Sequence, residues 1–150
     1  MKKEVKNELS VEFPSLSSNE SLARSLTSAF CLIVNPTMEE LADIKCAVSE
    51  AVTNCIVHGY AGTIGTVEMG MRLYADRTLK ITVKDHGCGI PDVHKAMEPL
   101  FTTDPAGERS GMGFSIMENF TDTLKVNSAP GKGTKITMTK KLSHATKYNG

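Results

Sequence analysis

The sequence predicts an α+β domain, a two-layer sandwich in which helices cover one face of a mixed sheet. Five short segments alternate apolar and polar residues, the pattern of strands that bury one face. Two longer segments carry apolar residues at three- and four-residue spacing, which is typical of amphipathic helices. The order of elements, a strand, two helices, two strands, a long loop, a helix and two strands, predicts this class.

The bulk composition indicates one ordinary globular domain over residues 1–150, with its core at about residues 8–141. The 17 basic and 17 acidic residues cancel, so no global charge favours a nucleic acid or an anionic membrane as the main partner. No signal peptide and no run of 18 apolar residues is visible. The four cysteines lack CxxC spacing, which disfavours a zinc site and fits a reduced, cytoplasmic protein.

The first strand is predicted at three alternating apolar residues, Leu9, Val11 and Phe13, and Pro14 ends it. Ser17 or Ser18 then offers an N-cap for a helix. The apolar positions of this helix fall at Leu22, Leu26, Phe30 and Ile33.

A second helix is predicted from near Met38 to about Val57, after the break at Asn35-Pro36. Gly59 is expected to close it in the left-handed conformation. Its apolar stripe consists of Leu41, Ile44, Val48, Ala51, Val52 and Cys55.

The second half of the chain predicts two hairpins around a loop and a helix. Alternating runs at residues 67–73 and 79–83 form the first hairpin. Residues 86–111 are rich in glycine and polar residues, with room for one short helix near 93–97, and such a long irregular stretch is more often functional than idle. A helix at about 112–119 and two strands joined by the turn at residues 130–133 complete the domain.

Glu50 and Asn54 lie four residues apart, so they share a helix face that His58 extends, beside the apolar stripe. A glutamate placed there could accept a proton or orient a water, a hydroxyl or a metal ion. An asparagine oxygen suits Mg²⁺, which prefers oxygen ligands. A solvated helix face is the alternative explanation of this pair.

Asp85 continues the inward phase of the strand at residues 79–83. A buried carboxylate is costly unless donors satisfy it, and the exocyclic amine of an adenine is one such donor. Gly87 and Gly89 would let backbone approach a planar ring. The alternative is that Asp85 only caps the following turn.

The glycine-rich segment from Gly107 to Phe114 leads into a helix, where free amides can bind an anion. Arg109 could neutralise charge on a transferring phosphoryl group. An ordinary flexible loop explains the segment equally well. No Walker-type or dinucleotide-binding motif is present, which disfavours P-loop and Rossmann chemistry.

Together these residues resemble the GHKL superfamily of ATP-binding domains and its Bergerat fold. The matching motifs are Glu50 and Asn54 of the N box, Asp85-x-Gly87-x-Gly89 of the G1 box, Gly111-x-Gly113 of the G2 box, and the last glycine motif at Gly133-Thr134. Residues 50–60, 108–114 and 117–120 are also similar to sporulation anti-sigma factors that act as serine-protein kinases. The resemblance covers residues from about 8 to 141.

The resemblance implies a catalytic base at Glu50, a Mg²⁺ ligand at Asn54, an adenine-reading carboxylate at Asp85 and a γ-phosphate contact at Arg109. Further contacts to ATP or ADP are implied for His58, Gly87, Gly89, Ser110, Gly111, Met112, Gly113, Phe114 and Thr134. Glu20 and Arg24 match the partner-facing part of the first helix, although Arg24 by itself looks like a solvated helix residue. The lid at residues 101–108 has an unusual Thr-Asp-Pro-Ala-Gly run. Cys88 fills a variable position of the G1 box, as an inert residue or a reactive thiol.

The resemblance also implies an activity and its partners. Such a protein inhibits a sigma factor of the F type and uses ATP and Mg²⁺ to phosphorylate a serine of an anti-anti-sigma factor, as a homodimer. One alternative is an anti-sigma module that binds nucleotide without kinase activity, against which the presence of Glu50 argues. A second is a detached histidine-kinase ATPase domain, disfavoured because only about a dozen residues precede the first strand and none of the four histidines falls in a helical hairpin there. Gyrase- or Hsp90-like machines need further domains.

Overall fold

The computed structural model describes residues 3–97 and 113–143. The first half of the chain forms β1 (Val5–Pro14), α1 (Asn19–Cys31), a 3₁₀ turn η1 (Leu32–Val34), α2 (Met38–Asn54) and a π turn η2 (Cys55–Gly59). The second half forms β2 (Thr66–Tyr74), β3 (Thr78–Asp85), α3 (Val93–Ala96), α4 (Gly113–Phe120), β4 (Thr123–Ala129) and β5 (Gly133–Lys141). The elements occur in the predicted order.

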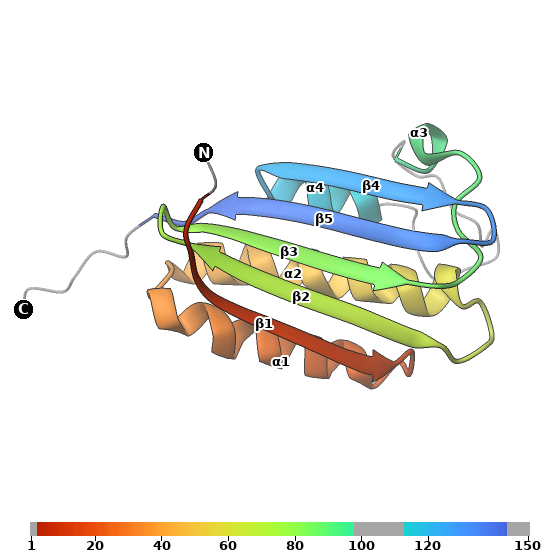
Figure 1. Cartoon of the computed structure of the whole chain (residues 1–150), viewed down its shortest axis with the longest axis horizontal. Coiled ribbons are helices and arrows are strands. Elements are labelled where there is room, and N and C mark those ends of the chain that lie inside the picture. Colours follow the sequence, from red (N-terminus) through yellow and green to blue (C-terminus); the bar gives the residue numbers. More distant parts are fainter. Residues whose placement is uncertain (1–2, 98–112, 144–150) are drawn as a thin grey trace, which may run out of the picture.

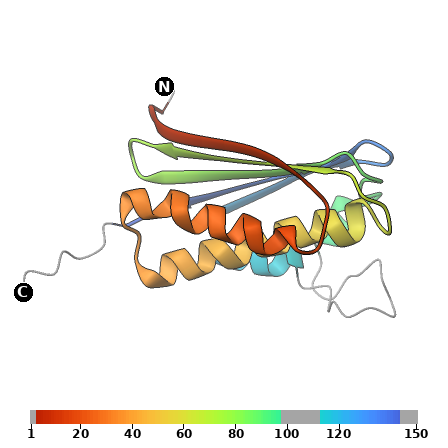
Figure 2. The ribbon, with the colours of Figure 1, turned by 90° about the horizontal axis from the view of Figure 1, so that it is seen from below.

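The strands form a single sheet in the order β1-β2-β3-β5-β4 (Figure 1). Viewed from below, α1, α2 and α4 lie on one side of this sheet, so the predicted two-layer α+β class is confirmed (Figure 2). The expected mixed sheet is wrong, because every pair in the described sheet is antiparallel. The closing hairpin places β5 beside β3 and β4 at the edge. Strands β1, β3 and β4 therefore run in one direction and β2 and β5 in the other, and no two strands of the same direction are neighbours.

The core lies between the sheet and α2. Strands β2, β3 and β5 turn alternate residues inward. Together α2 and η2 bury the stripe that the sequence predicted, except for Leu41, which is half-buried. The largest fully buried side chains include Ile44, Met69, Met71, Leu79, Ile81, Met117, Ile136 and Met138. None of the helices within the described ranges is long and apolar enough to cross a membrane.

The prediction for the first helix is wrong in part: Phe30 is buried and Leu26 packs partly buried against the core, but Leu22 and Ile33 lie outside it. Leu22 is 45% exposed and Ile33 is 65% exposed. The buried positions are Ala23, Thr27, Phe30 and Cys31. The small side chains of Ala23 and Thr27 suit the close packing of α1 against α2. Ile33 lies beyond the end of α1, so the helical spacing does not apply to it. Ser18 occupies the N-cap position, but its side chain makes no capping hydrogen bond.

The second helix begins with a capping box that the sequence reading missed. The Thr37 hydroxyl accepts from the Glu40 amide at 3.1 Å, and the Glu40 carboxylate accepts from the Thr37 amide at 2.9 Å. The same carboxylate accepts from the amide of Ser143 at 2.8 Å, which fastens the end of the described chain to α2. Burial opposes the charge of Glu40, yet the hydrogen bonds from Ser143 and Thr37 hold its pKa below the ordinary value.

Candidate nucleotide site

The candidate site lies at the end of the molecule where α2 gives way to η2 and β3 ends (right in Figure 1). The turn between β4 and β5 lies at the same end, because Asp85 of β3 pairs with Thr134 at the start of β5. The residues that the sequence singled out in these separate segments are thereby brought to one edge of the sheet.

Asp85 is fully buried. Its Oδ1 accepts from the Gly87 amide at 2.9 Å, so the predicted turn-capping role is real. Its Oδ2 is also buried, and no nitrogen or oxygen of the described residues donates to it. A buried carboxylate oxygen without a partner is costly, so the structure leaves one acceptor available for a ligand donor such as an exocyclic amine.

The Cys55 thiol lies near the Asp85 carboxylate and is fully buried. Burial, followed by the negative charge of Asp85, raises the pKa of this thiol, which therefore stays protonated. A neutral thiol is at most a weak donor, and it does not replace the missing strong partner of Oδ2.

Gly59 is buried beside Asp85 and is not in the left-handed conformation, so its expected role as a left-handed helix cap is wrong. A Cβ on Gly59 would lie 2.7 Å from Asp85 Oδ2, and a Cβ on Gly87 would overlap the Gly59 carbonyl oxygen. Backbone, rather than a planar ring, therefore fills the space that Gly87 leaves open. Gly89 does adopt positive φ, 75°, where the chain turns toward the end of β4.

Ser128 joins the loop after β3 to the closing hairpin, and no sequence pattern marked it. Its hydroxyl accepts from the Ile90 amide at 2.7 Å and lies 2.8 Å from the Thr134 hydroxyl. It donates to the Gly133 carbonyl at 3.0 Å, so Thr134 supplies the proton of the hydroxyl pair. Thr134 is thereby fixed opposite Asp85 in the sheet.

Glu50 and Asn54 are both half-buried beside the apolar stripe of α2, as predicted. A Cβ on Gly113 would lie 3.3 Å from Glu50 Oε2, so this carboxylate reaches the amino end of α4. Phe114, the next residue of α4, is buried. His58 lies within η2, where its carbonyl accepts from the Cys88 thiol at 3.2 Å. The described residues contain no group of three or more histidine, cysteine or acidic side chains that could hold a metal.

Four predicted site residues, Arg109, Ser110, Gly111 and Met112, lie outside the described residues, as does the lid at 101–108. Their assignments stay predictions. Within the described residues, the candidate site consists of the ends of α2 and β3, the start of α4 and the turn before β5.

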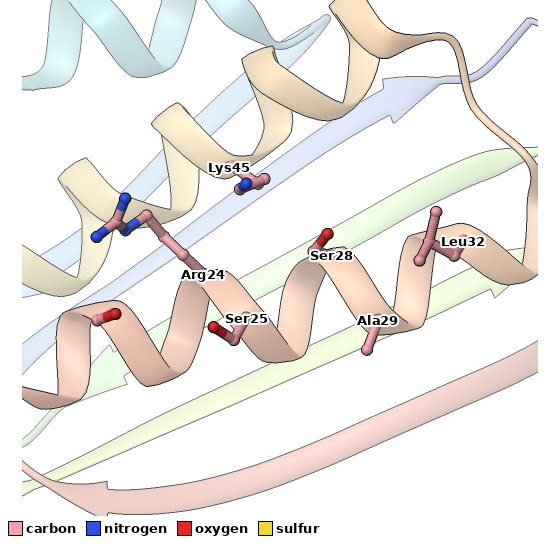
Figure 3. A pocket seen from close by; sticks show the side chains of 7 residues that line it. Arg24, Ser25, Ser28, Ala29, Leu32 and Lys45 are labelled. Atoms are coloured by element: carbon pink, nitrogen blue, oxygen red, sulfur yellow. The ribbon is translucent and has the colours of Figure 1, made fainter.

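The predicted partner-facing pair, Glu20 and Arg24, lies on α1. Arg24 lines a groove of about 380 Å³ between α1 and α2 (Figure 3). Arg24 Nε lies 3.0 Å from Glu20 Oε1, an ion pair whose N–H is not aligned for a hydrogen bond, while Nη2 donates to Oε2 at 3.3 Å. The Ser49 hydroxyl also donates to Glu20, which links the pair to the residue before Glu50. Lys45 lines the same groove.

The fold and the site define a class of protein. The chain belongs to the histidine kinase-like ATPase domain family, whose model matches residues 13–140, and within it to the group of the anti-sigma F factors. The anti-sigma F factor of Bacillus licheniformis is 51% identical over 140 residues, covering 93% of this chain and 95% of that protein. The anti-sigma F factor of Caldanaerobacter subterraneus subsp. tengcongensis is 52% identical, covering 91% of this chain and 95% of that protein.

Solved structures agree with the fold. The chain aligns with the RsbU and RsbW domains of Rv1364c from Mycobacterium tuberculosis at TM-score 0.70 and 18% identity, over 97% of this chain and 35% of that one. It aligns with the histidine kinase domain of Erythrobacter litoralis EL346 at TM-score 0.53 and 19% identity, over 87% of this chain and 62% of that one. The family is one of ATPase domains, which implies that the chain binds ATP or ADP.

Proposed function

We propose that this protein is an ATP-dependent serine kinase that also binds and inhibits a sporulation sigma factor of the F type. Its phosphorylation substrate is a serine of an anti-anti-sigma factor. The names of its relatives support the anti-sigma role. The observation that carries the kinase role is the position of Glu50, whose carboxylate reaches the amino end of α4 from the helix that also presents Asn54.

In the proposed reaction, Glu50 accepts the proton of the substrate serine hydroxyl. The serine oxygen then forms a bond to the γ-phosphorus of ATP, and the bond from that phosphorus to the β,γ-bridging oxygen breaks, which releases ADP. Asp85 orients the nucleotide through the adenine amine. Arg109 neutralises charge on the transferring group. Mg²⁺, held by the Asn54 amide oxygen and the phosphates, would supply further neutralising charge.

Glu20 and Arg24 are proposed to contact the protein partners. Arg24 lines an accessible groove, and its ion-pair partner Glu20 is tied through Ser49 to the helix that carries Glu50. We also propose a homodimer and a cytoplasmic location, where a sigma factor would be met. Different affinities of the ATP and ADP states for each partner would let the nucleotide select among them.

The test is the Glu50→Gln variant, assayed for phosphate transfer from labelled ATP to the anti-anti-sigma factor. Loss of a general base predicts a fall in transfer of about 100-fold or more, with ATP affinity nearly unchanged. Glu39→Gln, an exposed position at the other end of the same helix, is the matched control. Retained turnover in Glu50→Gln would refute the catalytic assignment. If the wild-type protein binds ATP and the sigma factor but transfers no phosphate, the binding-module alternative stands instead.

A further inference from the structure

Tyr60, the residue directly after η2, holds the backbone on both sides of the candidate site. The residue is only 9% exposed. The hydroxyl donates to the Thr66 carbonyl at 2.6 Å and accepts from the His86 amide at 2.8 Å. It therefore ties the start of β2 to the residue that immediately follows Asp85.

Gly59 holds the same turn from the other side. Its carbonyl accepts from the Cys88 amide at 2.9 Å. Its missing side chain makes room for the Asp85 carboxylate, since a Cβ would lie 2.7 Å from Oδ2 and 2.8 Å from Cγ. The Gly87 amide therefore holds Oδ1, and the carboxylate keeps its position only while residue 59 has no side chain.

The π turn η2 brings Gly59 and Tyr60 together to the turn that follows Asp85. The Tyr60 amide donates to the Cys55 carbonyl at 3.0 Å, five residues back, instead of continuing the α-helical pattern. π turns inside or at the end of helices frequently occur at functional sites. Here the π turn follows Asn54 directly, so the backbone that carries the proposed metal ligand continues into the two residues that hold Asp85.

We propose that Gly59 and Tyr60 are positioning residues that set the selectivity of the site for a purine with a 6-amino group. This proposal rests on the proposed function, in which Asp85 accepts a hydrogen bond from that amine. A single oxygen, Oδ2 of Asp85, accepts the hydrogen bond from the 6-amino group. A displacement of the Asp85–Cys88 turn therefore weakens that hydrogen bond, while contacts to the sugar and the phosphates persist. Neither residue needs to touch the nucleotide for this effect.

The test compares the dissociation constants for ATP and for inosine triphosphate, which carries an oxygen in place of the 6-amino group. Tyr60→Phe keeps the ring and removes both hydroxyl hydrogen bonds. We expect it to lower the preference for ATP by about fivefold or more, on the scale of one weakened hydrogen bond to a charged group. Tyr74→Phe, a tyrosine at the far end of β2, is the matched control and should keep the wild-type preference.

A second variant, Gly59→Ala, forces the Asp85 carboxylate to move and should lower the preference further. Its control is Gly70→Ala, whose Cβ would meet only the Thr82 hydroxyl, at 2.8 Å, and the Leu9 carbonyl, at 3.9 Å, on the outer face of the sheet. Reduced stability does not mimic the effect, because both nucleotides bind the same folded state and a smaller folded fraction weakens both affinities by the same factor. The ratio therefore reports selectivity alone.

Asp85→Asn separates the two proposals. If Asp85→Asn removes the preference for ATP, and Tyr60→Phe or Gly59→Ala has no further effect in that background, the positioning role is supported. If Asp85→Asn removes the preference while both variants keep it in the wild-type background, the positioning role is overturned and the base-reading role survives. If neither the wild type nor Asp85→Asn distinguishes the two nucleotides, the base-reading role itself fails.

Discussion

Replacing Asp85 by asparagine should separate nucleotide affinity from stability. Asparagine keeps an oxygen that can accept from the Gly87 amide, but it puts a donor where Oδ2 now lies. In the free protein that oxygen is buried without a nitrogen or oxygen donor among the described residues, so the substitution removes a buried carboxylate that is only partly satisfied by hydrogen bonds. In the complex the new amide faces the adenine amine, donor against donor.

The two effects have opposite signs and can be estimated. A hydrogen bond to a charged group contributes about 1.5–3 kcal/mol, so its loss predicts an ATP affinity about 10- to 150-fold weaker. Folding stability should stay the same or rise, because a buried carboxylate with one oxygen lacking a strong donor costs more than a buried amide. Such an exchange of stability for function is common at binding sites.

Calorimetric titration with ATP and a denaturant-unfolding curve would measure both quantities on the same preparations. Asp76→Asn is a matched control, because Asp76 also accepts from the amide two residues on, that of Thr78, but lies exposed at the other end of β3. It should leave ATP affinity unchanged. A variant at Asp85 that unfolds more easily while binding ATP as tightly as the wild type would refute the reasoning, since the carboxylate would then be structural.

Three further predictions follow from burial and charge. Folding lowers the pKa of Glu40, so the ionised carboxylate stabilises the folded state. This stabilisation is complete above the unfolded pKa of about 4.3 and is lost as the pH falls through the lower folded pKa. The Tm of Glu40→Gln should therefore fall less steeply than that of the wild type on acidification below about pH 5. Ile44→Ala should lower the free energy of unfolding by about 2–5 kcal/mol, whereas Ile33→Ala, at a 65% exposed position, should change it by about 0.5 kcal/mol or less, as urea titration would show. Exposed Cys88 should react with a thiol reagent before unfolding, whereas Cys55, buried and with a raised pKa, should react only after it, as mass spectrometry of labelled peptides would reveal.

Most of the fold could be predicted from local sequence patterns. Alternation located the strands, helical spacing located α2, and Pro14 marked the end of β1, because each depends on residues close along the chain. The same reasoning failed on α1, where Leu22 lies outside and Ala23 inside. Which face of a short helix is buried depends on what packs against it, and α1 packs against α2 as well as covering the sheet edge.

The residues of the candidate site and the faces on which they lie could also be predicted from the sequence. Glu50 and Asn54 had to share a face once α2 was a helix, and Asp85 had to point inward once β3 was a strand. The distance between the α2 pair and Asp85 could not be predicted from the sequence, because it depends on the sheet order that sets β5 beside β3 and on the turn that follows α2.

The sequence by itself therefore determined which elements form and which chemical groups they present, since helix and strand periods act over a few residues. The tertiary structure alone decided that every strand pair is antiparallel, that one oxygen of Asp85 stays without a strong partner, and that Gly59 and Tyr60 hold the turn beside it. These features arise from contacts between segments far apart in the sequence, such as Val5 of β1 paired with Tyr74 of β2 and the Ser15 hydroxyl bound to the Gly65 amide near the start of β2. No local pattern encodes such contacts, because they depend on how whole elements pack.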